Sequence, residues 1–179
     1  MKWLSTSTLA CLILTASQFS FAGAYSDTKH GGKYPTYPKM QFSNCKKPAA
    51  AKRGEYLAKM GDCIACHTAK GGTPFAGGTQ LKVPFGPMHF TFYGPNLTPD
   101  KKTGIGKWSD KEFIRSMRDG VSPHGILFPA FPYLWFNRIK TKDLLDIKAY
   151  LNCLPPVKNK VHTNKMLFQI GRASCRERV

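Results

Sequence analysis

The residues with the clearest chemistry in this sequence lie in the segment Cys63-Ile64-Ala65-Cys66-His67. Two thiols three positions apart fall on one turn of a helix, where both can add to the vinyl groups of a single haem. The histidine that follows directly is then placed to bind the iron as its proximal ligand. The pattern therefore predicts one covalently attached haem c, held by Cys63 and Cys66, with His67 on the iron.

Two other kinds of site also use a C-x-x-C pair. A zinc knuckle usually needs a second pair of ligands, and within residues 23–169 the only other cysteines are the isolated Cys45 and Cys153. A thioredoxin-like redox pair belongs in a βαβ setting, which the surrounding sequence lacks. Haem attachment is favoured, and zinc binding and thiol redox chemistry are the alternatives.

A helix must lead directly into this motif. Residues 49–60 have helical periodicity, and their apolar side chains share one face: Tyr56, Leu57 and Met60. Gly54 offers a place in this helix where another helix can approach closely. We therefore expect the motif to follow a helix that is packed against a second one.

Two further helices are expected nearer the C-terminus. The capping box Ser109-Asp110-Lys111-Glu112 opens one, and Gly120 ends it. Thr141 can cap another over residues 141–154, and Pro155-Pro156 stops it. Apolar residues recur in this last helix at helical spacing: Leu144, Ile147, Leu151 and Leu154. The stretches between the helices are rich in Gly and Pro and are expected to form long loops.

Short motifs in a familiar order surround these elements: 53–57, 61–63, 65–69, 74–78, 84–86, 96–100, 103–106, 108–110, 129–133, 149–151 and 154–157. Over about residues 53–168 the chain resembles the first haem domain of the cytochrome c subunit of membrane-bound alcohol, aldehyde and gluconate dehydrogenases. The resemblance implies a mainly α fold, a small class I-like cytochrome c domain. About three to five helices would surround one covalent haem, with long Gly/Pro-rich loops between them.

The same resemblance implies a function. Such a domain transfers single electrons in the periplasm, as a subunit or partner of a quinoprotein or flavoprotein dehydrogenase that passes electrons to quinone or an oxidase. Catalysis would then belong to the partner, within a membrane-associated complex, and this chain would be an electron carrier. Relatives often have two or three such domains in series, so further haem domains are expected after about residue 168. The alternative is a haem enzyme or haem-based sensor with an open sixth iron position.

One position departs from the resemblance. Phe131 stands where relatives commonly have methionine as the sixth iron ligand, and Ile139 stands where some relatives have a later methionine. The candidates in this chain are His124, in the loop before Phe131, and Met88. The third alternative is that no side chain fills the sixth iron position, which allows small molecules to bind the iron.

Cys45 and Cys153 flank the first and last expected helices, which cross in small cytochromes. An oxidising compartment permits a disulfide between them. The alternative is two unpaired thiols.

The N-terminus has the features of a secretory signal peptide. Lys2 precedes an apolar run over residues 9–21, and small residues allow cleavage after Ala22 or Ala24. The run is too short to span a membrane, so no transmembrane helix is expected after cleavage. We expect a signal peptide over residues 1–22 and export to the periplasm or the outer face of the inner membrane. A linker over residues 23–45 and the haem domain over residues 46–169 would follow.

The last ten residues, IGRASCRERV, resemble the translation of a common sequencing adapter and are expected not to be native.

The whole chain has 27 basic and 10 acidic residues, a net charge of +17. Residues 23–169 alone hold 23 basic and 9 acidic side chains, a net charge of +14. Nucleic acid is an unsuitable partner outside the cytoplasm, so the charge favours attraction of an acidic redox partner.

Overall fold

The structure, a computed structural model, describes residues 35–85, 88–128, 130–162 and 164. All of them belong to the unit that spans residues 32–179. The expected signal peptide (1–22), residues 23–34 of the expected linker and the expected adapter-derived tail (170–179) lie outside the described residues. No helix in the described ranges has both the length and the apolar character needed to cross a membrane.

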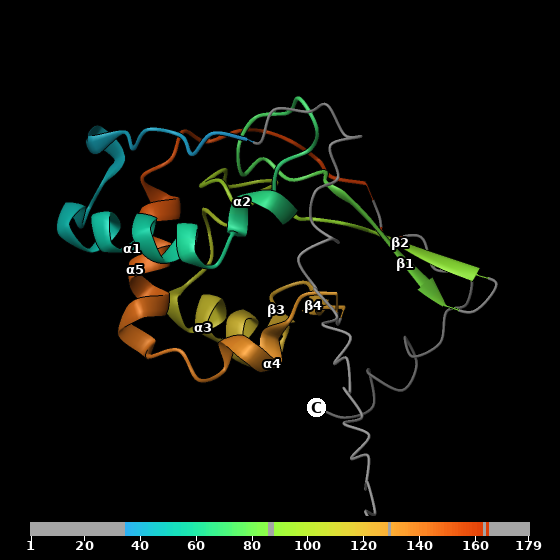
Figure 1. Cartoon of the computed structure of the whole chain (residues 1–179). Helices are drawn as coiled ribbons and strands as arrows, with labels where there is room; N and C mark the ends of the chain where they lie inside the picture. Colours follow the sequence, from blue (N-terminus) through green and yellow to red (C-terminus); the bar gives the residue numbers. More distant parts are fainter. Residues whose placement is uncertain (1–34, 86–87, 129, 163, 165–179) are drawn as a thin grey trace, which may run out of the picture. The chain divides into compact units, whose positions relative to one another are not determined.

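Helices are the main regular elements of the described residues, and loops connect them (Figure 1). The part of the chain that the structure describes has five α-helices: α1 (Pro48–Met60), α2 (Cys63–Cys66), α3 (Asp110–Asp119), α4 (Tyr133–Phe136) and α5 (Thr141–Asn152). A 3-10 turn, η2 (Phe42–Asn44), precedes them. Two antiparallel hairpins pair β1 (Gln80–Phe85) with β2 (Met88–Tyr93), and β3 (Val121–Ser122) with β4 (Gly125–Ile126). The expected mainly α fold is confirmed.

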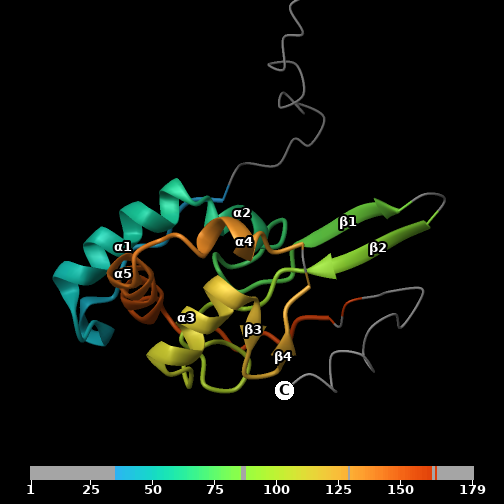
Figure 2. The same cartoon turned by 90° about the horizontal axis from the view of Figure 1, so that it is seen from below.

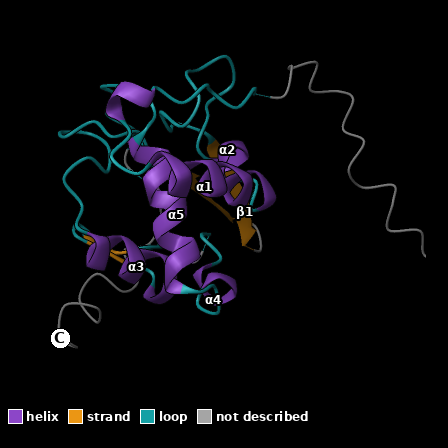
Figure 3. Ribbon diagram, turned by 90° about the vertical axis from the view of Figure 1, so that its left-hand side faces the viewer, coloured by secondary structure: helices purple, strands orange, loops and turns teal. Residues whose placement is uncertain are grey.

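Helices α1 and α5 cross at a glycine. A Cβ atom on Gly54 would overlap the carbonyl oxygen of Asp146 and would stand 2.9 Å from the backbone nitrogen of Ile147. Only a residue without a side chain lets two backbones approach this closely. Figures 1 and 3 show the two helices lying across each other. The close approach expected at Gly54 is confirmed.

The buried face of α1 differs from the expected one. Ala51, Gly54 and Ala58 are buried, whereas Tyr56 and Met60 are 63% and 70% exposed. The close crossing at Gly54 explains the error, because only small side chains fit beside a helix packed this tightly. Leu57 is the one member of the expected face that packs against the core among the described residues.

The other two expected helices form nearly as expected. In α3, the Ser109 hydroxyl accepts from the Glu112 N–H and the Glu112 carboxylate accepts from the Ser109 N–H, so both halves of the capping box are present. Helix α5 buries its apolar stripe but ends at Asn152. The expected capping role of Thr141 is wrong, because its hydroxyl instead accepts a hydrogen bond from Arg118 at 2.9 Å.

The β1–β2 hairpin occupies a stretch where loops were expected (Figure 2). Its strands pair antiparallel, with Leu81 opposite Phe92 and Lys82 opposite Thr91. Alternating apolar and polar residues on both sides of a two-residue connection are the sequence signal for such a hairpin. Pro84 is unfavourable in a central strand because it has no N–H to donate, but an edge strand such as β1 tolerates proline. Phe92 anchors the hairpin, since it is buried and stacks on Phe128 with ring centroids 4.0 Å apart.

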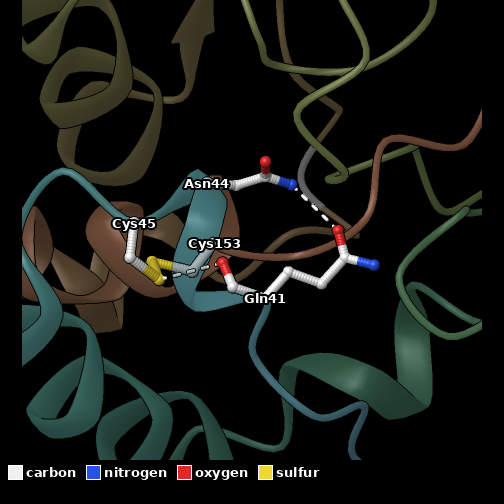
Figure 4. The surroundings of a disulfide bond; sticks show 4 residues. All are labelled: Gln41, Asn44, Cys45 and Cys153. Atoms are coloured by element: carbon white, nitrogen blue, oxygen red, sulfur yellow. Dashed lines mark hydrogen bonds between the residues drawn. A yellow bond between two sulfur atoms is a disulfide. The ribbon is translucent and has the colours of Figure 1, made fainter.

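The described part of the expected linker, residues 35–45, lies against the helices. The Tyr37 hydroxyl donates to the carbonyl of Ala58 at 2.9 Å. The backbone N–H of Gln41 donates to the carbonyl of Cys153 at 2.8 Å. A disulfide joins Cys45 to Cys153, where the sequence left a disulfide and two thiols as alternatives (Figure 4). This segment is therefore tied to both α1 and the end of α5.

Replacement of Gly54 by alanine tests the helix crossing. We expect the free energy of unfolding to fall by about 1–3 kcal/mol, because the new methyl group meets rigid backbone. This loss would outweigh the ~1 kcal/mol by which alanine exceeds glycine as a helix former. Urea denaturation measures the change. Lys52→Ala, on the exposed face of α1, is the control and should change stability by less than about 0.5 kcal/mol. Unchanged or greater stability in Gly54→Ala would contradict the close crossing.

Removal of the disulfide tests the N-terminal attachment. The bond closes a sequence separation of 108 residues. The double variant Cys45→Ala, Cys153→Ala should therefore lose about 2–5 kcal/mol in urea denaturation. Reductant should weaken the parent to the same level and leave the double variant unchanged. A parent whose Cys45 and Cys153 are both alkylated without prior reduction would contradict the pairing.

Candidate functional site

A tight turn joins α1 to the C-x-x-C-H motif. The N–H of Gly61 donates to the carbonyl of Leu57 and ends α1. Asp62 follows in the left-handed region, with φ 47° and ψ 39°, a conformation that aspartate tolerates better than most residues. Helix α2 begins at the next residue, Cys63. The turn therefore places both cysteines on one short helix directly after α1.

The two cysteines of α2 are free thiols. Burial raises the pKa of Cys63 to about 11. Burial and the nearby Asp62 carboxylate also raise the pKa of Cys66. Thiol–disulfide enzymes use the opposite arrangement, in which the pKa of the attacking cysteine is lowered. The raised pKa values of both thiols thus give no support to the redox alternative.

The imidazole of His67 is fixed by a backbone carbonyl. Its Nδ1 atom lies 2.8 Å from the carbonyl oxygen of Pro95. Because a carbonyl can only accept, Nδ1 carries the proton and Nε2 keeps its lone pair. Burial lowers the pKa of His67, against the opposing effect of the Pro95 hydrogen bond, so the ring is neutral at pH 7. A neutral, oriented imidazole is what a metal ligand requires.

Two glycines let neighbouring loops reach the backbone of the motif. A Cβ atom on Gly94 would overlap the carbonyl oxygen of Cys66. Gly77, with φ 78°, donates its N–H to the carbonyl of His67 at 2.8 Å. The motif is therefore enclosed by the loop before β1 and by the loop after β2.

Aromatic rings lie beside the cysteine pair. A Cβ atom on Gly61 would stand 3.6 Å from Cys63 Sγ and 3.8 Å from Cε1 of Phe136, which places the Phe136 ring next to the motif. Phe131 stacks on Phe136 with centroids 5.4 Å apart and an interplanar angle of 13°. The position where relatives commonly have methionine is thus filled by a ring packed on another ring.

The two candidate sixth ligands lie on the hairpins. His124 is exposed in the β3–β4 turn, where its backbone N–H donates to the Ser122 hydroxyl at 3.2 Å. In the described ranges, no hydrogen bond or ring contact joins His124 to the motif. Met88 is the first residue of β2, and its side chain lies outside the described part of the structure.

The ligands that a zinc site would need are not assembled in the part of the chain that the structure describes. No three His, Cys, Asp or Glu side chains gather there as a metal-ion cluster. Cys45 and Cys153 are joined to each other rather than to the motif. The zinc alternative therefore lacks its second pair of ligands within these residues.

Residues 94–98 contribute to the site in a way that sequence reasoning missed. Pro95 supplies the carbonyl for His67, and Gly94 lets the loop pass over Cys66. The available signal was Gly94-Pro95-Asn96 at the end of an alternating apolar segment. Because that segment was expected to be a loop, no reason existed to place Pro95 beside the histidine.

The residues present fit a covalently bound haem. Two free thiols share one helical turn, a neutral imidazole follows them, and stacked phenyl rings lie beside them. The donor set has the two sulfurs needed for covalent attachment and one nitrogen for iron.

Comparisons with known proteins agree with this chemistry. A model of the cytochrome c family matches residues 51–155. One component of the nicotinate dehydrogenase of Pseudomonas putida is 45% identical over 125 residues, which are 69% of this chain and 10% of that protein. The gluconate 2-dehydrogenase cytochrome c subunit of Pantoea cypripedii is 48% identical over 103 residues, 57% of this chain and 22% of that protein.

The cytochrome c subunit of alcohol dehydrogenase (quinone) from Gluconobacter oxydans is 43% identical over 103 residues, 57% of this chain and 21% of that protein. The chain thus spans only about a tenth to a fifth of the length of these relatives. The names of the gluconate and alcohol dehydrogenase relatives confirm the resemblance to cytochrome c subunits of dehydrogenases. Since the family model covers more than half of the residues and includes the whole C-x-x-C-H turn, this chain belongs to the cytochrome c family.

Proposed function

We propose that this chain carries single electrons through one haem c, as a cytochrome component of a dehydrogenase. The observation that carries the proposal is the arrangement of free Cys63 and Cys66 next to His67, whose Nδ1 is bound by Pro95. When bound, haem c supplies an iron that gains and loses one electron. The names of the relatives support the dehydrogenase context.

The protein's own residues would hold and orient this group. Cys63 and Cys66 would attach it through thioether bonds, and Nε2 of His67 would face the iron. Burial keeps the imidazole neutral, and the hydrogen bond to the Pro95 carbonyl holds its orientation. These roles need no proton transfer by side chains, which suits an electron carrier better than a catalyst.

The cellular setting is part of the proposal. Residues 1–22 would direct export, so the mature chain would work in the periplasm or at the outer face of the inner membrane. It would receive electrons from a dehydrogenase and pass them towards quinone or an oxidase. The apolar leader supports export. One relative is the cytochrome c subunit of an alcohol dehydrogenase (quinone), which supports quinone as the electron acceptor.

Helix α4 is the surface that we assign to a redox partner. Its two outer rings face inward, Tyr133 against Gly120 and Phe136 against Gly61. Leu134 and Trp135, between them, are 69% and 83% exposed. Because Phe136 and Cys63 both lie beside Gly61, α4 packs against the turn that leads into α2. A transient redox contact needs only a small interface of this kind.

Basic side chains beside α4 in the chain favour an acidic partner. Arg138 and Lys140 follow the helix and are exposed, and residues 120–142 contain no aspartate or glutamate. The acidic residues Asp119 and Asp62 stand next in the chain to the glycines on which α4 packs. An acidic protein surface with an apolar centre complements this pattern. We therefore expect a negatively charged redox protein as the partner.

The haem proposal predicts covalent attachment that depends on α2. The full chain, expressed with a haem attachment system, should gain the mass of one haem and keep it after denaturation. Cys63→Ala combined with Cys66→Ala should abolish this mass gain, because no sulfur is left to form a thioether. Mass spectrometry and haem staining of a denaturing gel provide the measurement.

Cys45→Ala is the matched control, since it removes a cysteine outside α2 and should retain the haem. Bound zinc together with two free thiols in the parent would contradict the proposal. The absorption spectrum then tests the role: a six-coordinate haem with histidine or methionine fits electron transfer. Rapid binding of carbon monoxide and cyanide would instead favour the enzyme or sensor alternative.

The partner surface predicts rates that depend on salt. Electron transfer from reduced flavodoxin, an acidic protein donor, should slow as ionic strength rises from about 0.01 M to about 0.15 M, where the Debye length shortens from about 30 Å to about 8 Å. Trp135→Ala should slow this reaction about 3–10-fold, because an exposed tryptophan at an interface centre contributes strongly to binding. Stopped-flow absorbance measures both effects.

Reduction by ascorbate should be unaffected by Trp135→Ala, because a small donor needs no docking surface. Phe42→Ala removes an aromatic side chain that is 57% exposed on η2, away from α4 in the chain, and should behave like the parent. Equal effects of both substitutions would show that α4 is not the contact surface.

A further inference from the structure

The hydrogen bond from His67 depends on where the carbonyl of Pro95 is held. Pro95 is exposed, and proline has no N–H with which to anchor its own position. The preceding residue, Gly94, is held through its backbone: its N–H donates to the carbonyl of Thr79 at 2.9 Å, and its carbonyl accepts from the N–H of Gly78 at 2.8 Å. On the other side, the position of the Pro95 carbonyl depends on the residue that follows it, Asn96.

Asn96 is 3% exposed, and both ends of its side chain are hydrogen-bonded. Its Nδ2 donates to the carbonyl of Val157 at 2.8 Å and to the Thr103 hydroxyl at 3.1 Å. Its Oδ1 accepts from the backbone N–H of Thr98 at 2.9 Å and from the Thr98 hydroxyl at 2.7 Å. A buried amide with this set of partners holds its backbone in one place.

These partners belong to segments far apart in the chain. Val157 follows the end of α5, and its N–H donates to the Thr98 hydroxyl at 3.1 Å. Asn159 donates its N–H to the Thr103 hydroxyl at 3.0 Å. The loop after β2 is thereby tied to the segment that leaves α5.

The opposite side of the loop is packed against the motif itself. A Cβ atom on Gly77 would stand 2.7 Å from the backbone nitrogen of Asn96, and the N–H of Gly77 donates to the carbonyl of His67. Asn96 is thus held between the C-terminal segment and the loop that contacts the histidine.

We propose that Asn96 is a positioning residue for the iron ligand: its side chain fixes the Pro95 carbonyl that orients His67. This inference rests on the proposed function of His67. Loss of the amide would free residues 95–98, lengthen the hydrogen bond to Nδ1 and weaken the electron donation of the imidazole. Because a hydrogen bond of this kind raises ligand basicity, its loss should raise the reduction potential.

The test is Asn96→Ala in the full, haem-loaded chain. We expect the His67 Nδ1 proton to exchange with solvent at least roughly tenfold faster, since its hydrogen bond opens more often. We also expect a higher reduction potential than that of the parent. NMR of the reduced protein and a potentiometric titration provide the two readouts.

The matched control is Lys148→Met. It removes a buried polar contact as well, since Lys148 Nζ donates to Asp110 and to the carbonyl of Trp108, but it touches neither residues 94–98 nor His67. It should lower stability in urea and leave both His67 readouts at parent values. Should Asn96→Ala fail to fold, Thr98→Val removes one of the same hydrogen bonds, from the Thr98 hydroxyl to Asn96 Oδ1, together with the hydrogen bond from the Val157 N–H. It should move both readouts in the same direction by less.

Two results would overturn the inference. One is parent-like exchange and potential in Asn96→Ala despite a loss of stability equal to that of Lys148→Met, which would make Asn96 a structural residue alone. The other is an equal shift of both readouts in Lys148→Met. Failure of the proposed function is seen separately, as a parent that attaches no haem. The ¹⁵N shift of His67 Nδ1 then still reports whether Asn96 positions the ring.

Discussion

The contact between Gly54 and the backbone of Asp146 is the constraint on which the rest of the structure depends. It lets α1 and α5 approach to backbone contact, so only small residues are buried on α1. Asp146 is itself largely buried and accepts from Arg53 at 2.9 Å and from Lys142 at 3.0 Å. Burial alone would raise the pKa of Asp146, but the hydrogen bonds and positive charges of Arg53 and Lys142 outweigh it and the pKa is lowered. The carboxylate therefore stays ionised where the helices meet.

From this crossing, the C-terminal end of α1 and the C-terminal end of α5 both lead towards the candidate site. Helix α1 ends at Gly61, and the left-handed Asp62 turns the chain into α2. Helix α5 ends beside Cys153, which the disulfide joins to the segment before α1. The chain beyond α5 then reaches Asn96, next to the carbonyl that binds His67. The cysteines and their histidine are thus positioned from two directions by the same pair of helices.

How far the sequence could predict this arrangement differs from residue to residue. The C-x-x-C-H motif was readable because its chemistry depends on spacing within five residues. The capping box at Ser109 was readable for the same reason, since a cap is a local hydrogen bond. The face of α1 was misjudged because Tyr56 and Met60 are apolar in type, while burial depends on how closely α5 approaches. The β1–β2 hairpin was missed because Pro84 and the neighbouring glycine favoured a loop.

By itself, the sequence determined the attachment chemistry, the main helices and the mainly α class, because each depends on contacts between residues near in the chain. Tertiary structure decided which residues hold the site together. The carbonyl of Pro95 lies 28 residues from His67, and the partners of Asn96 include Val157, 61 residues away. These hydrogen bonds form only once the helices have packed, because they join residues that are far apart in the chain and that no local sequence pattern connects. The same holds for Cys45 and Cys153, whose pairing was one of two alternatives until α1 and α5 were seen to cross.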